Sequence, residues 1–231
     1  MKTNIITFAH QKGGTGKSTI AWNVAVECKK NFKKYGYKKF IFVDLDNQES
    51  VTMTNRLRLK YKNKPLDIIR FTDNERGKLA EFLNDIEEDT LVIIDSGGYD
   101  ADLNRLAIIA SDFVITPVSS DYMEIFGLQK FKIILEELSV IKGMSVKAHV
   151  LLNKIDPKLK DFSDIKSFIT EIKNFKLLDS VIRFRSDYKH SIGYGYSVKE
   201  LDKKSKATLE LNNLIKEIEK KASLKNGKKK K

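Results

Sequence analysis

The sequence predicts an α/β protein, a single domain in which helices cover both faces of a mostly parallel, twisted sheet. Short apolar runs alternate with longer segments of helical periodicity along the chain, and this alternation is typical of parallel sheets. With 231 residues, 41% of them hydrophobic and 32% charged, the chain is long enough to bury one sizeable core. No second domain is needed to account for its length.

The expected elements follow from this alternation. We expect strands near residues 4–9, 39–43, 67–71, 90–95, 113–117 and 146–152. We expect helices near residues 18–34, 76–86, 103–110, 124–141, 164–174 and 204–222. Residues 1–222 would form the domain and residues 223–231 a basic, lysine-rich tail.

The first strand leads into a glycine-rich loop, which reads HQKGGTGKST from His10 to Thr19. Glycines in such a loop let successive backbone N–H groups point at a phosphate, and the helix that follows adds its positive end. Lys17 would reach the β and γ phosphates, and the Ser18 hydroxyl would bind Mg²⁺. The predicted nucleotide-binding residues of this loop are Lys12, Gly13, Gly14, Thr15, Gly16, Lys17, Ser18 and Thr19.

A second lysine, Lys12, stands directly before the glycine pair, where a generic phosphate loop does not require one. This signature resembles the ParA/MinD family, the deviant Walker A ATPases of the SIMIBI class of P-loop NTPases. The resemblance implies that Lys12 crosses a dimer interface to phosphates held by the other subunit, while Lys17 acts within its own. Two positive loops repel until a polyanionic nucleotide lies between them. The resemblance therefore implies an ATP-dependent homodimer that uses ATP and Mg²⁺.

Two aspartates end the second strand, in the segment Asp44-Leu45-Asp46. They would lie at the carboxyl edge of the sheet, where ligands of open α/β folds bind. The segment resembles the family's switch, typically Asp-x-Asp-Pro-Gln-Gly. The resemblance implies that Asp44 organises the metal and the switch, and that Asp46 orients or activates the attacking water. Asn47 and Glu49 replace the usual Pro and Gly, which leaves the loop geometry open, and a solvated acidic strand end is the alternative.

The fourth strand ends in Asp95 at the same edge of the sheet. We expect Asp95 to be the Mg²⁺ carboxylate, acting through a water, because Mg²⁺ usually retains several of its own. The segment that follows has Gly97 and Gly98 where many relatives have a proline pair. These glycines would bring backbone N–H groups to the γ phosphate as a second switch, or form an ordinary turn.

The sixth strand is followed by Asn153-Lys154-Ile155-Asp156. An Asn-Lys-x-Asp tetrad is also how many GTPases read guanine, with Asp156 accepting hydrogen bonds from the base. In the ParA family the equivalent strand end commonly offers Asn to adenine, which would be Asn153 here. We favour ATP because the Lys12 signature and the pair of aspartates belong to an ATP-using family.

Positive charge is concentrated at the C-terminal end of the chain. The net charge is +12, and residues 203–231 contribute +8 of it, from eleven lysines against three glutamates. Such an arm suits contact with DNA phosphates that does not depend on base sequence. A solubilising tail is the alternative for the last four lysines. The resemblance loosely places DNA contacts at Arg183, Arg185, Lys203, Lys204, Lys206, Lys220 and Lys221.

The last helix carries an apolar stripe, Leu211, Leu214, Ile215 and Ile218, at helical spacing. An interfacial membrane helix would look similar. The stripe is narrow and lacks Trp and Phe, so we expect it to pack on the sheet, and no membrane partner is expected. One cysteine, Cys28, no signal peptide and no membrane span indicate a reducing cytosol.

The sequence therefore predicts a cytoplasmic, nucleoid-associated DNA-partitioning ATPase. By the resemblance, its dimer binds DNA non-specifically until a centromere-bound, ParB-like partner stimulates hydrolysis. Turnover should be slow because no arginine finger is evident in cis. The alternatives are a MinD-like positioning protein for division or flagella, and a metabolic ATP-dependent enzyme on the same fold. A nitrogenase-type reductase is excluded, since one cysteine per subunit cannot supply four cluster ligands from a dimer.

Overall fold

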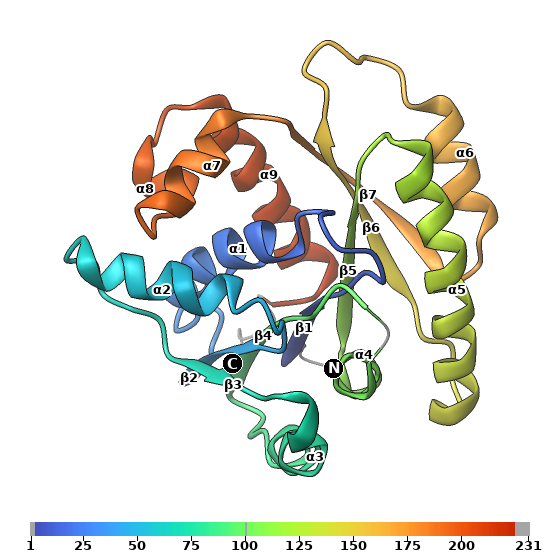
Figure 1. Cartoon of the computed structure of the whole chain (residues 1–231), viewed down its shortest axis with the longest axis horizontal. Helices are drawn as coiled ribbons and strands as arrows, with labels where there is room; N and C mark the ends of the chain where they lie inside the picture. The colour runs from blue at the N-terminus through green and yellow to red at the C-terminus, as the bar shows by residue number, and fades with distance from the viewer. Residues whose placement is uncertain (1–2, 100, 225–231) are drawn as a thin grey trace, which may run out of the picture.

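The computed structural model describes residues 3–99 and 101–224. Within these ranges seven strands form one sheet, in the order β3-β2-β4-β1-β5-β6-β7, and every neighbouring pair is parallel (Figure 1). The strands are β1 (Ile5–Phe8), β2 (Lys39–Asp44), β3 (Ile68–Arg70), β4 (Thr90–Asp95), β5 (Phe113–Val118), β6 (Ala148–Ile155) and β7 (Phe175–Arg183). The predicted α/β fold with a mostly parallel sheet is confirmed.

Helices join the strands and cover the sheet. They are α1 (Lys17–Asn31), α2 (Ser50–Lys60), α3 (Arg76–Asn84), α4 (Asp102–Ala110), α5 (Tyr122–Lys142), α6 (Ser163–Glu171), α7 (Ser186–Gly193), α8 (Val198–Leu201) and α9 (Lys206–Lys221), with a short 3₁₀ turn η1 (Asp73–Glu75) before α3. Helices α1 and α9 pack on one face of the sheet, and α3, α4, α5 and α6 pack on the other (Figure 1). The domain therefore has the three layers that the sequence predicts.

The sequence prediction missed α2, β7, α7 and α8. In α2 the buried positions are Val51, Thr54 and Arg58, and two of these three side chains are polar, so no apolar stripe marks the helix. Strand β7 lies at the sheet edge, and its exposed Lys176 and Asp179 interrupt the apolar run. The helix expected at 164–174 ends earlier, at Glu171, which leaves room for β7.

The apolar stripe of α9 is buried. Leu211, Leu214, Ile215 and Ile218 are all at most 9% exposed and belong to the core on that face of the sheet. This confirms packing on the sheet rather than membrane docking. Among the described residues, no helix has the length and apolar character needed to cross a membrane.

The boundary expected between domain and tail falls near the end of α9. Leu224 falls within the predicted tail but is buried in the core, so the packed domain extends at least to this residue. Residues 225–231, with most of the predicted tail, lie outside the described residues.

The central strands deliver the predicted functional segments to one edge of the sheet. In the β2–β4 pair, Asp44 lies directly opposite Asp95. Phe8, at the end of β1, is also paired with Asp95. Because all these strands are parallel, their carboxyl ends meet beside the loop that links β1 to α1.

Candidate nucleotide-binding site

The loop between β1 and α1 has the backbone that its glycines predict. Gly14 and Gly16 adopt left-handed conformations, with φ of +81° and +92°. Gly16 caps the N-terminus of α1. A Cβ on Gly16 would lie 2.4 Å from Asn153 Nδ2, so a larger residue would also displace that side chain.

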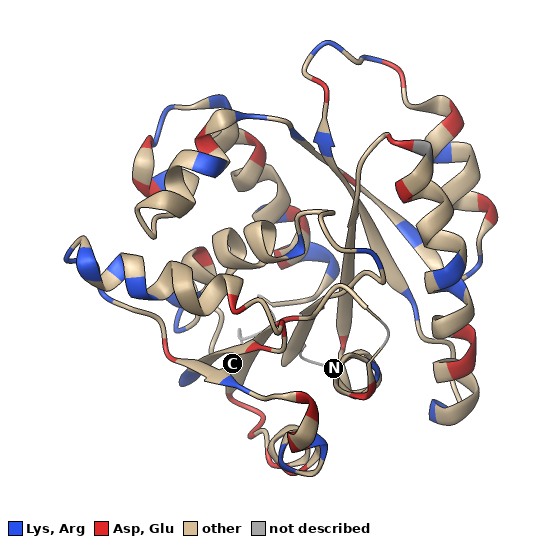
Figure 2. Ribbon diagram, viewed as in Figure 1, with Lys and Arg blue, Asp and Glu red and all other residues tan. Residues whose placement is uncertain are grey.

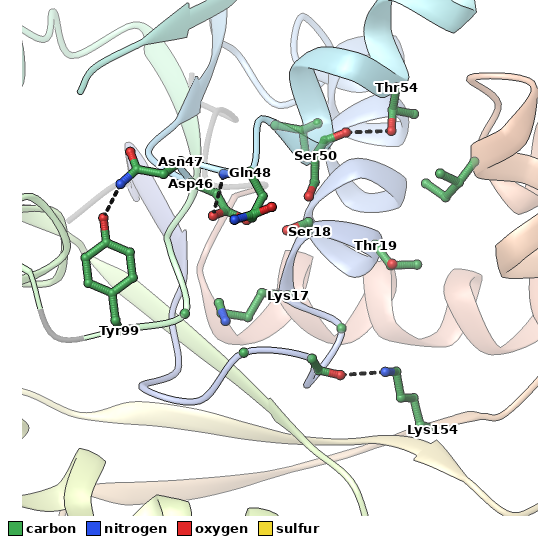
Figure 3. Close-up of a pocket in the computed structure, with 16 residues that line it drawn as sticks. Lys17, Ser18, Thr19, Asp46, Asn47, Gln48, Ser50, Thr54, Tyr99 and Lys154 are labelled. Atoms are coloured by element: carbon green, nitrogen blue, oxygen red, sulfur yellow. Dashed lines mark hydrogen bonds between the residues drawn. The ribbon is translucent and has the colours of Figure 1, made fainter. Parts of the chain in front are cut away.

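This loop borders a cavity of about 580 Å³. Figure 3 shows Lys17, Ser18 and Thr19 on one side of it and the segment after β2 on another. Its lining residues are Gly13, Gly14, Gly16, Lys17, Ser18, Thr19, Asp46, Asn47, Gln48, Ser50, Val51, Thr54, Gly98, Tyr99, Lys154 and Ile192. With α1 pointing its N-terminus toward it, the cavity suits an anion.

The two lysines of the loop occupy different environments. Lys17 is 6% exposed, lines the cavity, and its Nζ donates to the Lys12 carbonyl at 3.1 Å. Burial lowers the pKa of Lys17, whereas the carboxylates of Asp95, Asp46 and Glu124 raise it. Phosphate in the cavity would likewise stabilise the charged amine.

Lys12 is exposed and is not among the residues that line the cavity. Its backbone N–H donates to His10 Nδ1 at 2.9 Å, and its carbonyl accepts from Lys17. The backbone of Lys12 is therefore fixed by its own loop, while its side chain faces solvent.

Asp95 is a buried carboxylate without a hydrogen bond of ordinary geometry from the described residues to either oxygen. Burial raises its pKa well above the usual range. The nearby Ser18 hydroxyl and Lys17 lower it, and the charges of Asp44 and Asp46 raise it further. Such a carboxylate beside a serine hydroxyl fits the predicted Mg²⁺ site.

The rest of a Mg²⁺ coordination shell would have to come from outside these side chains. The described part of the chain has no cluster of three or more His, Cys, Asp or Glu residues that could hold a metal. Mg²⁺ commonly takes one or two protein oxygens together with waters and substrate phosphates. Ser18 and Asp95 are compatible with that arrangement.

Asp44 is fully buried and its oxygens are already engaged. Oδ1 accepts from the Asp46 N–H at 3.1 Å, and Oδ2 accepts from the Thr52 N–H at 3.2 Å and the Thr52 hydroxyl at 2.6 Å. Burial raises the pKa of Asp44, and these hydrogen bonds oppose the shift. Asp44 thus holds the segment after β2 against the first turn of α2. Its contact with a metal stays a prediction.

The two departures from the family pattern are accommodated within this segment. Glu49 has φ of +53°, so it adopts the left-handed conformation that glycine takes readily. Its carboxylate accepts from Arg70 Nη1 at 2.8 Å. Asn47 Nδ2 donates to the Tyr99 hydroxyl at 2.6 Å (Figure 3). It also donates to Asp73 Oδ2 at 3.0 Å. We refer to these three residues, Asn47, Tyr99 and Asp73, as the clasp.

The glycine pair after β4 packs on the phosphate loop. A Cβ on Gly98 would lie 2.8 Å from the Cα and 3.0 Å from the N of Gly13. The Gly97 N–H donates to Asn104 Oδ1 at 3.1 Å. The Gly97 N–H is therefore not directed at the cavity, which differs from the expectation that it would contact the γ phosphate as part of a second switch. Gly98 does line the cavity.

Asn153 and Lys154 brace the phosphate loop from β6. Asn153 is buried, and its Nδ2 donates to the Thr15 carbonyl at 2.8 Å. Lys154 Nζ donates to the Gly14 carbonyl at 2.5 Å (Figure 3). Both residues also line a neighbouring cavity of about 470 Å³, which shares Gly16, Thr19, Lys154 and Ile192 with the first.

Sequence reasoning missed the opposite wall of this second cavity, which Phe184, Tyr188 and Ile192 form. These residues lie at or beyond the end of β7, and β7 was not predicted. Had the strand been recognised, its carboxyl end would have indicated them. Asp156 is not among the residues that line this cavity, and its Oδ1 accepts from the Lys158 N–H at 2.7 Å.

The residues predicted to contact DNA divide into two groups. Arg185 pairs with Glu210 at 2.5 Å, Lys221 pairs with Glu217 at 2.8 Å, and Arg183 donates to two backbone carbonyls. The cations that are exposed and have no ion pair among the described residues are Lys203, Lys204, Lys206 and Lys220. The first group is engaged within the protein, so the second is better placed for an external anion.

Comparison with known proteins agrees with this geometry. Residues 6–198 match the CobQ/CobB/MinD/ParA nucleotide binding domain. The virulence plasmid ParA family protein pGP5-D of Chlamydia psittaci is 26% identical over 256 residues, covering 96% of this chain and 95% of the relative.

Two solved structures share the fold. A Borrelia burgdorferi B31 protein described as a plasmid partition protein, bound to AMPPNP, has a TM-score of 0.72 at 18% identity, over 95% of this chain and 100% of that one. The septum site-determining protein MinD of Pyrococcus horikoshii OT3, complexed with Mg-ADP, has a TM-score of 0.68 at 17% identity, over 98% and 100%.

Proposed function

The chain belongs to the CobQ/CobB/MinD/ParA family of nucleotide-binding domains, and we propose that it is a ParA-like, Mg²⁺-dependent DNA-partitioning ATPase. ATP joins two copies of the chain, and the dimer binds DNA non-specifically on the nucleoid. Slow hydrolysis, stimulated by a centromere-bound ParB-like partner, releases it. The similarity to the ParA family protein of the C. psittaci virulence plasmid supports partition as the role.

The separation of the two loop lysines is the observation that carries this proposal. Lys17 is buried in its own cavity, and Lys12, five residues earlier, is exposed outside it. A cation held on a fixed backbone and directed to solvent is suited to phosphates bound by a second copy. Nucleotide then neutralises the repulsion between two positive loops.

The side chains around the cavity support the chemistry. Asp46 lines it, and its Oδ1 accepts from the Gln48 N–H at 3.1 Å, which orients the carboxylate toward a role in positioning water. Ser18 and Asp95 would hold Mg²⁺, which neutralises phosphate charge when bound. Lys17 supplies a further positive charge from within the same subunit.

ATP is favoured over GTP by the second cavity. Asn153 lines it, whereas Asp156, which would have to read guanine, is not among its lining residues. Competition between ATP and GTP for binding tests this preference. Displacement of bound ATP by equimolar GTP would contradict it.

The central experiment is co-sedimentation with DNA in ATP, in ADP and without nucleotide, at two salt concentrations. We expect binding in ATP that weakens at the higher salt. Equal binding in all three states would remove the nucleotide switch from the proposal.

Two variants test the assigned roles. Lys12→Ala should abolish ATP-dependent pairing and hydrolysis, whereas Lys173→Ala, which removes an exposed lysine after α6, serves as the charge-matched control. Normal turnover by Lys12→Ala would refute the role of Lys12. Asp46→Ala should trap the ATP-bound dimer on DNA, and free exchange of that variant would contradict its role in positioning water.

A further inference from the structure

The segment from Ser50 to Leu66, which contains α2, carries five cations and no acidic residue. Arg58 is buried, and the other four cations are exposed on α2 and the turn after it. We refer to these four, Arg56, Lys60, Lys62 and Lys64, as the α2 basic patch.

Arg58 fixes this segment to the rest of the domain. Its two terminal nitrogens donate to the Glu200 carboxylate at 2.7 and 2.9 Å, and Nη1 also donates to the Gly195 carbonyl at 3.0 Å. The Tyr61 ring packs edge-on against Tyr194, with centroids 5.0 Å apart. The basic patch is therefore presented by a helix anchored to α7 and α8.

The acids nearest to the patch are neutralised by other cations. Glu49 pairs with Arg70 at 2.8 Å, and Asp67 pairs with Lys29 at 2.7 Å. Arg56 reaches Glu49 only at 3.9 Å and is 72% exposed, so this contact screens it weakly. With Glu200 bound to Arg58, the patch keeps its positive charge.

Further exposed cations follow α8. Glu200 belongs to α8, and Lys203 and Lys204 follow it as exposed residues. Figure 2 shows basic residues both at the outer end of α2 and in the connection from α8 to α9, on the same side of the molecule. Cations spread over two elements suit a long polyanion better than a compact anion.

The other end of α2 lies in the nucleotide site. Ser50, Val51 and Thr54 line the cavity beside the phosphate loop, and Thr52 donates twice to Asp44. Figure 1 shows α2 running from this site to the edge of the molecule. An 11-residue helix spans about 16 Å, so one rigid element connects the cavity with the basic patch.

We propose that the α2 basic patch binds the phosphate backbone of duplex DNA, and that nucleotide bound at the other end of α2 strengthens this contact. This inference rests on the proposed function and gives its DNA contact a location that the C-terminal lysines alone do not provide. The contact is to phosphate and carries no sequence preference.

The test compares two full-length variants that lose the same charge. The first combines Arg56→Gln, Lys60→Gln, Lys62→Gln and Lys64→Gln. The control combines Lys130→Gln, Lys147→Gln, Lys160→Gln and Lys173→Gln, four lysines that are exposed elsewhere on the domain. Affinity for a duplex of mixed sequence is measured against salt with a non-hydrolysable ATP analogue and with ADP. Melting temperature and analogue affinity are measured alongside to establish that each variant is folded.

Counterion release lowers the salt slope of log affinity by about 0.9 for each phosphate contact removed. We expect the slope of the patch variant to fall by up to about 3.6, with at least a tenfold loss of affinity, and the slope of the control to stay within about one unit of wild type. In the wild-type chain the slope should be steeper with the analogue than with ADP.

An unchanged slope in a folded patch variant, or equal losses in both variants, would overturn the inference and leave the proposed function standing. A wild-type chain that binds no duplex in any nucleotide state would instead overturn the proposed function. Binding of vesicles containing phosphatidylglycerol that depends on the patch, with DNA binding unaffected, would assign the patch to a membrane and refute the DNA contact.

Discussion

Replacing Gly98 by alanine tests the contact between the loop after β4 and the phosphate loop. Gly98 is not in a left-handed conformation, so its backbone accepts alanine and space alone decides the outcome. The added Cβ would lie 2.8 Å from the Cα of Gly13 and 3.0 Å from its N. Both neighbours are backbone atoms, so no side-chain rotation relieves the overlap.

The size of the effect follows from these distances. Carbon atoms in contact normally lie about 3.5 to 4.0 Å apart, so the two loops must separate by roughly 0.7 Å or more. Misplacing catalytic groups by about 1 Å lowers rates by on the order of a hundredfold. We therefore expect kcat/KM for ATP hydrolysis to fall between about tenfold and a hundredfold. Overpacking should lower the unfolding free energy by about 1–3 kcal/mol. We expect no larger loss, because a surface loop can move.

The assay is steady-state ATP hydrolysis together with thermal unfolding. Gly77→Ala is the matched control, since a Cβ there meets no atom within 4 Å and Gly77 lies in α3. It should keep wild-type kinetics and gain about 0.5–1 kcal/mol of stability. Wild-type kinetics in a folded Gly98→Ala variant would refute the claim that the approach of these loops shapes the site.

Three further outcomes follow from the contacts around the site. Burial raises the pKa of Glu200. The Arg58 guanidinium lowers it and helps to hold it at about 2, against an ordinary value of 4.5. Ionised Glu200 then contributes about 3 kcal/mol of unfolding free energy above pH 4.5, which is lost as the pH falls toward 2, so Glu200→Gln should flatten the acid side of a stability–pH curve. Glu49→Gly should be more stable to urea than Glu49→Ala by about 1–2 kcal/mol, because both lose the ion pair but only alanine keeps left-handed strain. Asn47→Ala should lower kcat, and adding Tyr99→Phe should lower it little further, because both changes break the same clasp; fully additive losses would show that the two residues act separately.

The phosphate loop and the strand-end aspartates could be predicted because their residue types follow directly from the local backbone structure. Gly14 and Gly16 need left-handed conformations, which few other residues adopt. Asp44 and Asp95 end apolar strands, and parallel strands bring their carboxyl ends together. Local sequence thus specified both the conformation of the loop and the neighbours it meets.

The second cavity and the α2 surface could not be predicted in this way. Helix α2 is held by Arg58 and its bonds to Glu200, 142 residues later, and such a contact leaves no periodic signal. The wall formed by Phe184 and Tyr188 depends on an edge strand whose apolar pattern is interrupted. Both features arise from tertiary contacts that override local pattern.

Glu49 shows how a residue that departs from the family pattern is accommodated in this chain. Its left-handed backbone costs roughly 1–2 kcal/mol more than glycine would. The ion pair with Arg70, each side chain being 29% exposed, recovers only a part of that. Thr52 and Asp44 hold the next turn in place through two hydrogen bonds, which offset the unfavourable conformation of Glu49. A strained residue therefore stands directly before the first turn of α2, at the end of the helix that borders the nucleotide cavity.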